Sequence, residues 1–152
     1  MNLFGVMEVS GSALEAERIR AEVVAANMAN AETTRTAEGG PYRRQQVVFT
    51  SEAPQSGFAG QMLGAGGSPI ASSEPDIGGV RVSAVVPDQT PFLRRYDPGH
   101  PDADKDGYVS YPDINPVTEM VDLMGATRAY GLNSSAVQAE KSMVSASLDI
   151  LK

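Results

Sequence analysis

The chain has 152 residues and a mass of 16.0 kDa, and 41% of its residues are hydrophobic while only 6% are aromatic. This length and composition predict one ordinary domain with a modest hydrophobic core. The 12 basic and 19 acidic residues give a net charge of -7, which excludes the basic surface that attracts nucleic acid or anionic lipid. Cysteine is absent, so disulfides, thiolate metal sites and cysteine nucleophiles are excluded as well.

The first residues lack the features of a cleaved secretory signal. No Lys or Arg occurs from Met1 to Met7, and Glu8 follows, so the basic region and the apolar core of a signal peptide are both missing. The longest uncharged stretch, Ala53–Ser73, is rich in Gly, Ser and Gln and does not suit a membrane span. We expect no membrane insertion, and we expect any export from the cytoplasm to use no cleaved signal.

A long N-terminal helix is predicted from a 3.5-residue repeat. No Pro occurs from Met1 to Gly40, so a helix of about six to eight turns is expected. Six of the eight positions in the repeat are apolar, and the eight positions are Leu3, Met7, Ser10, Leu14, Glu17, Ala21, Val24 and Met28.

A second long helix is predicted from about Pro116 almost to Lys152. Pro suits the first turn of a helix, Asn115 is a candidate N-cap, and Glu119 is placed to complete a capping-box-like arrangement. Seven of the ten positions in its repeat are apolar, namely Met120, Leu123, Tyr130, Val137, Val144, Leu148 and Leu151, and the other three are Thr127, Ser134 and Lys141.

The middle of the chain is rich in helix breakers, because Gly39–Pro101 contains 10 Gly and 8 Pro. Only short strands are credible there. Ala53–Gly79 is mostly Gly, Ser, Pro and Ala and is predicted to be a flexible loop. The candidate strands are Arg44–Phe49, Val80–Val86, Phe92–Tyr96 and Tyr108–Tyr111.

These elements predict an α+β fold, in which two long terminal helices form an antiparallel coiled-coil-like pair and the middle section is small, β-rich and loop-rich. We expect residues 1–36 and 115–152 to form a helical core. Residues 37–114 would form a β-rich outer section, including a flexible loop at about 52–79.

Apolar residues outside the two repeats widen the apolar surface of both helices beyond what one partner helix covers. Such residual surface favours packing against further helices in an assembly. The alternative is that the middle section folds back over it, although that section is poor in large apolar residues. The residues concerned are Phe4, Val6, Val23, Val117, Val121, Met124 and Ile150.

An acidic stretch resembles a calcium loop in its spacing. Asp102, Asp104, Asp106, Gly107 and Asp113 follow the EF-hand pattern, with Asp where the bidentate Glu would stand. Prolines before, within and after the stretch exclude the flanking helices that such a loop needs. We favour a tight Asp-Gly turn leading into the strand at residues 108–111, with a calcium-binding module as the alternative.

No pattern in the sequence predicts catalysis. His100 is the only histidine; a hydrolase using it is a third hypothesis, but no nucleophile or second ligand stands near it, and a local hydrogen bond is the simpler role. The doublets Arg43–Arg44 and Arg94–Arg95 suit salt bridges to carboxylates, either within this chain or on a partner. We expect no metal and no cofactor.

The polar residues Asn27, Asn30, Thr33 and Thr34 follow the first helical repeat. Asn is an indifferent helix former, so these residues either end the helix or hydrogen-bond to a neighbour in a packed bundle.

Four blocks of the sequence carry recognisable motifs. They are AANMANAETT at 25–34, GGPYRRQQVVF at 39–49, YDPGHPDAD at 96–104 with Gly107–Val109, and EMVD at 119–122 with RAY at 128–130. The first block resembles the flagellar rod, hook and filament axial family, although Ala26 precedes a single Asn27 where many members have two adjacent asparagines. The other blocks resemble, within that family, the proximal rod proteins of the FlgC type.

This resemblance implies a structural subunit of the bacterial flagellar basal body, exported by the flagellum's own apparatus into the periplasmic rod. The partners it implies are other proximal rod proteins, the distal rod protein, the rod–export-gate adaptor and further copies in a helical assembly. It implies that the terminal helices form an inner tube and the β-rich section lies outside. The candidate interface residues are Leu3, Met7, Leu14, Val24, Asn27, Met28, Asn30, Met120, Leu123, Met124, Tyr130, Val137, Val144, Leu148 and Leu151.

Overall fold

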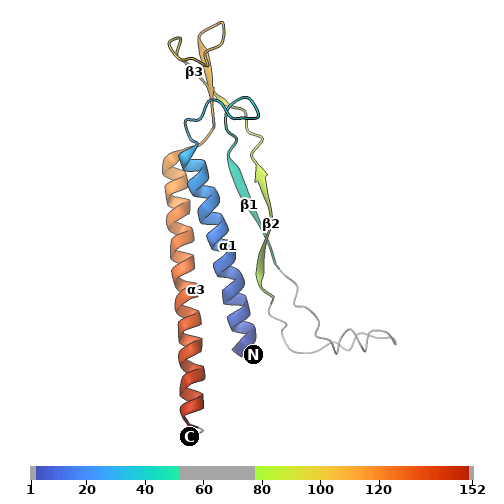
Figure 1. Cartoon of the computed structure of the whole chain (residues 1–152), viewed down its shortest axis with the longest axis vertical. Helices are drawn as coiled ribbons and strands as arrows, with labels where there is room; N and C mark the ends of the chain where they lie inside the picture. The colour runs from blue at the N-terminus through green and yellow to red at the C-terminus, as the bar shows by residue number, and fades with distance from the viewer. Residues whose placement is uncertain (1–2, 52–77, 151–152) are drawn as a thin grey trace, which may run out of the picture.

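The computed structural model describes residues 3–51 and 78–150, so the loop expected at about 52–79 lies almost entirely outside the described residues. Figure 1 shows two long helices side by side, one pair of strands beside the first helix and a second pair beyond the ends of the helices. The order is α1 (Leu3–Ala29), β1 (Gln45–Ser51), β2 (Val80–Pro87), β3 (Leu93–Tyr96), β4 (Tyr108–Tyr111) and α3 (Pro116–Ile150). The predicted α+β fold is confirmed.

Both predicted helices are confirmed, with 27 residues in α1 and 35 in α3. Asn115 caps α3 as expected, because its Oδ1 accepts a hydrogen bond from the N–H of Val117 at 3.0 Å. The capping-box role predicted for Glu119 is wrong. Its carboxylate instead accepts hydrogen bonds from Asn27 and Arg44, which lie far away in the sequence.

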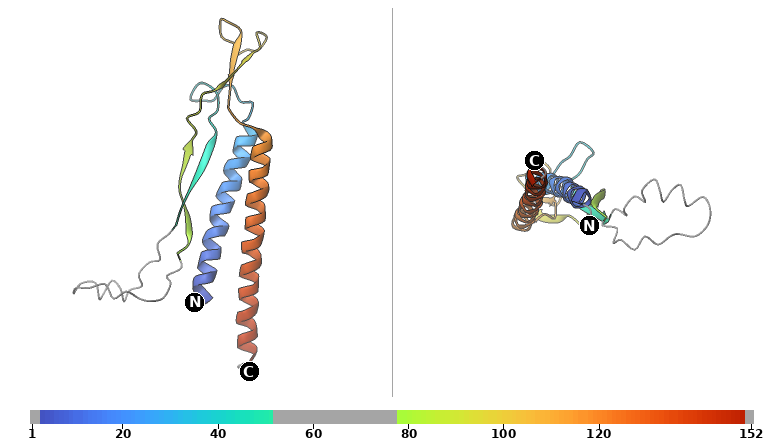
Figure 2. Two further views of the ribbon diagram at one scale, coloured as in Figure 1. Left: turned by 180° about the vertical axis from the view of Figure 1, so that it is seen from behind. Right: turned by 90° about the horizontal axis from the view of Figure 1, so that it is seen from below.

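The helices are antiparallel, and both chain ends lie at the same end of the molecule (Figures 1 and 2). The face of α3 that meets α1 is offset from the predicted repeat. The buried residues of α3 are Glu119, Ala126 and Glu140, whereas the predicted seam residues Met120 and Tyr130 are exposed. The polar contacts of Glu119 turn this neighbouring face toward α1.

Strands β1 and β2 form an antiparallel pair beside α1, on the side away from α3 (Figures 1 and 2). The pair has a bulge where Val48 faces Ala84 but Phe49 faces Val82. At the start of β2, the N–H of Val80 donates to Oγ of Ser12 on α1 at 3.1 Å. The middle section therefore folds back over α1, while the outer side of α3 stays uncovered.

Strands β3 and β4 pair antiparallel, from Leu93 opposite Tyr111 to Tyr96 opposite Tyr108. The connecting loop ends at Gly107, whose φ of 81° lies in the left-handed region. A Cβ at this position would lie 2.9 Å from Cε2 of Tyr96, so glycine is needed for space as well as for backbone conformation. All four predicted strands are confirmed to within about two residues.

Neither described helix combines the length and the apolar character that a membrane-spanning segment needs.

Candidate assembly interface

Asn27, in the last turns of α1, acts as a hydrogen-bonding neighbour for the first residue of β1. Its Nδ2 donates to the carbonyl of Gln45 and its Oδ1 accepts from the N–H of Gln45, both at 2.9 Å. Nδ2 also donates to Glu119 at 3.1 Å, and Oδ1 accepts from the hydroxyl of Tyr42 at 3.2 Å. The amide, 1% exposed, thus uses its full hydrogen-bonding capacity and fixes β1 against α1.

Glu119 connects this amide to α3. It is 1% exposed, and its Oε1 accepts a hydrogen bond from Nε of Arg44 at 2.6 Å. A terminal nitrogen of Arg44 also lies 3.8 Å from Asp122. Burying a carboxylate is costly unless it is paired and hydrogen-bonded, and Arg44 and Asn27 supply both kinds of contact to Glu119.

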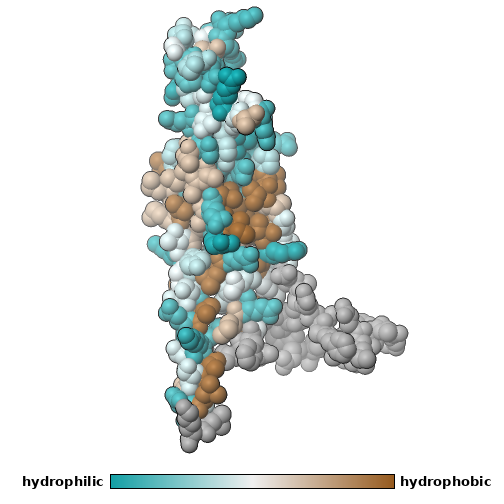
Figure 3. Space-filling view, in the orientation of Figure 1, coloured by the Kyte–Doolittle hydropathy of each residue, from teal (hydrophilic) through white to brown (hydrophobic). Residues whose placement is uncertain are grey.

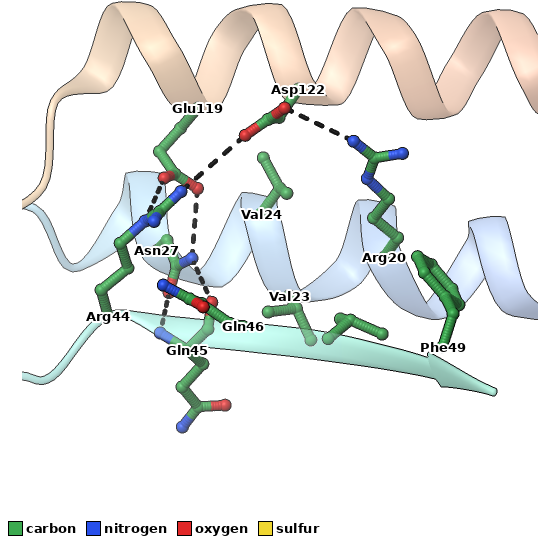
Figure 4. A pocket seen from close by; sticks show the side chains of 11 residues that line it. Arg20, Val23, Val24, Asn27, Arg44, Gln45, Gln46, Phe49, Glu119 and Asp122 are labelled. Atoms are coloured by element: carbon green, nitrogen blue, oxygen red, sulfur yellow. Dashed lines mark hydrogen bonds and ion pairs between the residues drawn. The ribbon is translucent and has the colours of Figure 1, made fainter. Parts of the chain in front are cut away.

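We call the side chains of Asn27, Tyr42, Arg44, Glu119 and Asp122 the Asn27 cluster. Figure 4 shows all of them except Tyr42, converging from α1, the residue before β1 and the first turns of α3 beside a hollow of about 250 Å³. Arg20 of α1 extends the cluster, because it lies 3.4 Å from Asp122. The cluster thereby joins three elements that are distant in the sequence.

The environment of the Asn27 cluster shifts the pKa of Tyr42. Partial burial raises the pKa of its phenol above the ordinary value of 10.0, and the nearby charge of Glu119 raises it further. The neutral hydroxyl is the form that donates to Asn27, so both effects favour the protonation state that the cluster uses.

A second set of polar contacts ties the end of α1 to the β3–β4 loop. Asn30 donates through Nδ2 to the carbonyl of Ala26 at 2.9 Å, which helps to end the helix. The hydroxyl of Thr34 donates to Asp102 at 2.8 Å, and Arg35 lies 3.7 Å from the same carboxylate. Asp102 is therefore held by the segment that follows α1.

The acidic loop has the contacts of a turn. Oδ1 of Asp104 accepts from the N–H groups of Tyr108 and Asp106, both at 2.9 Å, and Oδ2 pairs with Arg94 at 2.7 Å. The hydrogen bond from Tyr108, together with those from Asp106 and Arg94, lowers the pKa of Asp104 despite some desolvation. Within residues 3–51 and 78–150 no group of three or more potential ligands gathers to hold a metal ion, and nothing supports the calcium alternative.

The histidine and the arginine doublets also have local partners. Nδ1 of His100 accepts from the N–H of Asp102 at 3.1 Å, which confirms the local hydrogen bond predicted for it. Arg43 lies over the ring of Phe92 at 4.5 Å, and Arg95 over Tyr111 at 4.2 Å. The other arginine of each doublet makes an ion pair within the chain, as described above.

The structure divides the candidate interface residues by exposure. Val24 and Asn27 are buried between the elements of this chain, and the side chain of Leu3 and all of Leu151 lie outside what the structure describes. Those that are partly buried are Met7, Leu14, Met28, Asn30, Leu123, Val137 and Val144. Those that are exposed are Met120, Met124, Tyr130 and Leu148.

The exposed apolar surface of α3 is extensive. On the side turned away from α1, Val117 is 70% exposed, Val121 63% and Met124 62%. Figure 3 shows apolar surface over the upper part of α3, along its lower part and over the β1–β2 pair. Surface of this kind on a long helix is typical of a site that another protein covers.

Sequence reasoning missed the partnership of Tyr42, Arg44, Glu119 and Asp122. A signal was present, because Glu119 and Asp122 are three residues apart and so share one face of a helix that otherwise carries Leu123 and Ala126. Acidic residues at such positions need a buried cation or amide. Which residue supplies that cation or amide depends on tertiary contacts.

Comparison with known proteins agrees with this architecture. The family model described as "Flagella basal body rod protein" matches residues 7–35, and the one described as "Flagellar basal body rod FlgEFG protein C-terminal" matches residues 105–150. The first match falls largely on α1, and the second includes β4 and α3.

Whole-length relatives carry the same name. The chain is 40% identical to the flagellar basal-body rod protein FlgC of Borreliella burgdorferi over 100% of this chain and 99% of that one. It is 40% identical to FlgC of Bacillus subtilis over the whole of both chains. With FlgC of Salmonella typhimurium the identity is 38%, over 95% of this chain and 94% of the other. The chain therefore belongs to the family of flagellar basal-body rod proteins of the FlgC type.

Proposed function

We propose that this chain is a non-enzymatic structural subunit of the proximal rod, which transmits torque through packed helices. The observation that carries the proposal is the exposed apolar side of α3. The proposal is supported by relatives that are rod proteins and that match this chain over its whole length. The Asn27 cluster supports a mechanical role, because it braces α1, β1 and α3 against one another with buried hydrogen bonds.

The exposed C-terminal end of α3 supports association with other subunits. Leu148 lies near the end of α3 and is 59% exposed, and Ile150 is 85% exposed. We propose that other proximal rod proteins, the distal rod protein, the rod–export-gate adaptor and further copies of this chain cover such surface. The subunit would lie in the periplasmic part of the rod.

We further propose the division of labour expected from the sequence. Residues 1–36 and 115–152 would form the core of the rod wall, and residues 37–114 would lie outside it. The candidate interface residues that are exposed, Met120, Met124, Tyr130 and Leu148, would meet neighbours directly. The buried ones, such as Asn27, would act by fixing the shape that presents them.

The variant Val121→Asp/Met124→Asp tests the proposal, because both side chains are exposed and the isolated chain should fold as before. We expect loss of swimming and of the chain from purified basal bodies, with an unchanged thermal melt. Ser145→Asp, at an exposed polar position on the same helix, is the matched control and should swim. Deleting residues 120–152 should also abolish swimming. Normal swimming of the double variant or of the deletion would contradict the proposal.

A further inference from the structure

The two helices present different outer faces to solvent. Every residue of the α1 outer face is exposed; this face consists of Glu8, Gly11, Glu15, Arg18, Glu22, Ala25, Ala26 and Ala29. The upper half of the α3 outer face is also exposed throughout and consists of Val117, Val121, Met124, Arg128 and Leu132. Both sets follow the helical spacing of three and four, so each forms one continuous stripe.

The two faces are complementary in size. The α3 outer face carries large apolar side chains, with Leu132 67% exposed as well as the three described above. The α1 outer face ends in three alanines, and a Cβ added to its Gly11 would meet no atom within 4 Å. Large side chains of one helix can therefore enter the gaps left by small side chains on another.

The faces are also complementary in charge. The α1 outer face carries Glu8, Glu15 and Glu22 at intervals of seven residues, and its one cation, Arg18, lies 3.7 Å from Glu22. None of the five residues of the upper α3 outer face is acidic, and Arg128 is its one cation. Arg128 forms no ion pair with any residue that the structure describes. An acidic partner surface thus suits this arginine.

Heights along the helices match as well. Asn27 contacts Glu119 and the helices are antiparallel, so steps up one helix correspond to steps down the other. By this contact Arg128 is level with Arg18, and by the contact of Arg20 with Asp122 it is level with Leu14. Glu15 therefore lies within about 2 to 5 Å of the height of Arg128, at about 1.5 Å per residue. By the contact of Asn27 with Glu119, Val121 is level with Ala25.

We propose that the α3 outer face of one copy packs against the α1 outer face of a second copy beside it at about the same height. This inference rests on the proposed role as a rod subunit. A contact between the α3 outer faces of two copies would bring the Arg128 side chains of both copies together. A contact between two α1 outer faces would bring glutamates together. The contact joins two different surfaces, so it repeats around an axis and builds a ring or a helical wall.

Cysteine cross-linking tests the proposal cleanly, because the chain has no cysteine of its own. One strain would produce differently tagged Ala25→Cys and Val121→Cys variants together, and its basal bodies would be isolated and oxidised. We expect a dimer containing one copy of each variant. Strains that make only one variant should give no dimer.

Three outcomes would overturn the inference. These are basal bodies that contain both variants but no mixed dimer, a dimer of Val121→Cys with itself, and links only to a different rod protein. In each case the chain is in the rod, so its proposed function stands. In a further case, the two cysteine variants are stable but are absent from basal bodies that do contain the unmodified chain. The cross-link between residues 25 and 121 then cannot form, and this result also counts against the inference. If the unmodified chain is also absent, the proposed function itself fails.

Charge reversal supplies a second test of the same contact. Arg128→Glu should lower the yield of mixed dimer about tenfold, because it opposes glutamate to glutamate, and Glu15→Arg in the same chain should restore most of it. Lys141→Glu, at an exposed cation away from the outer face, is the matched control and should leave the yield unchanged. An equal loss in the control, or no recovery with Glu15→Arg, would contradict the proposed pairing.

Discussion

At the scale of single residues, one side-chain amide, that of Asn27, pairs with the backbone of β1 as a neighbouring strand would. Asn27 meets both backbone groups of Gln45, which no hydrophobic side chain could do. The same amide holds Glu119 in the buried position that Arg44 neutralises. Asn27 therefore links α1, β1 and α3 through hydrogen bonds.

Replacing this amide should be costly. Asn27→Ala leaves the buried Glu119 and the partly buried polar groups of Gln45 and Tyr42 with fewer partners, so we expect the free energy of unfolding to fall by about 2 to 4 kcal/mol. Urea denaturation of the purified chain measures the change. Asn133→Ala is the matched control, because Asn133 bonds only within α3, to the carbonyl of Ala129, and should change stability by less than about 0.5 kcal/mol. Equal effects of the two variants would contradict this role.

The phenol of Tyr42 gives the cluster a dependence on alkaline pH. Its pKa is raised in the folded chain, so the stability it contributes is complete below its unfolded pKa near 10 and is lost as pH rises through the folded pKa. We expect the urea midpoint of the wild-type chain to fall more steeply above pH 10 than that of Tyr42→Phe. Phenolate absorbance, measured in parallel, should differ between the two chains in the same range. Identical slopes would show that Tyr42 carries no such linkage.

At the scale of elements, sequence periodicity predicted both helices and all four strands. It placed the contact face of α3 only in part, because Leu123 and Val137 are partly buried while Met120 is exposed. A repeat of apolar residues cannot reveal that Glu119 and Glu140 are buried. The capping role of Glu119 was wrong for the same reason. Local propensity identifies an element, whereas its rotation depends on long-range partners such as Arg44.

Gly79, just before β2, lies so close to α1 that there is no room for a side chain at this position. A Cβ on Gly79 would lie 2.5 Å from Oγ of Ser12, the atom that accepts the hydrogen bond from Val80. Gly79→Ala should therefore lower the free energy of unfolding by about 1 to 2 kcal/mol. Gly125→Ala, inside α3 with no atom within 4 Å of the added Cβ, should raise it by up to about 1 kcal/mol. Thermal melts of both variants test the opposite signs, and stabilisation by Gly79→Ala would contradict the contact.

At the scale of the whole molecule, few large apolar residues are buried in the part of the chain that the structure describes. The buried apolar residues there are Ala16, Val24, Val109, Ile114 and Ala126, while much larger side chains on α3 are exposed. A chain with 6% aromatic residues gains limited hydrophobic stabilisation alone. We infer that part of its core is supplied by neighbouring subunits.

This shortage predicts weak protection of the helices in the isolated chain. Limited proteolysis of the isolated chain should trim the regions near residues 1–34 and 115–152, because local opening is easiest where few apolar contacts hold an element. The same regions should resist protease in purified basal bodies. A free chain that resists protease along its whole length would count against shared packing.

The central claim is that α3 completes its packing in the rod wall, and a cryo-electron map of intact basal bodies tests it most directly. The account predicts α1 and α3 within the wall and the side chains of Val117, Val121 and Met124 covered by a neighbouring subunit. A map in which this chain is absent from the rod, or in which those side chains face open solvent, would contradict it.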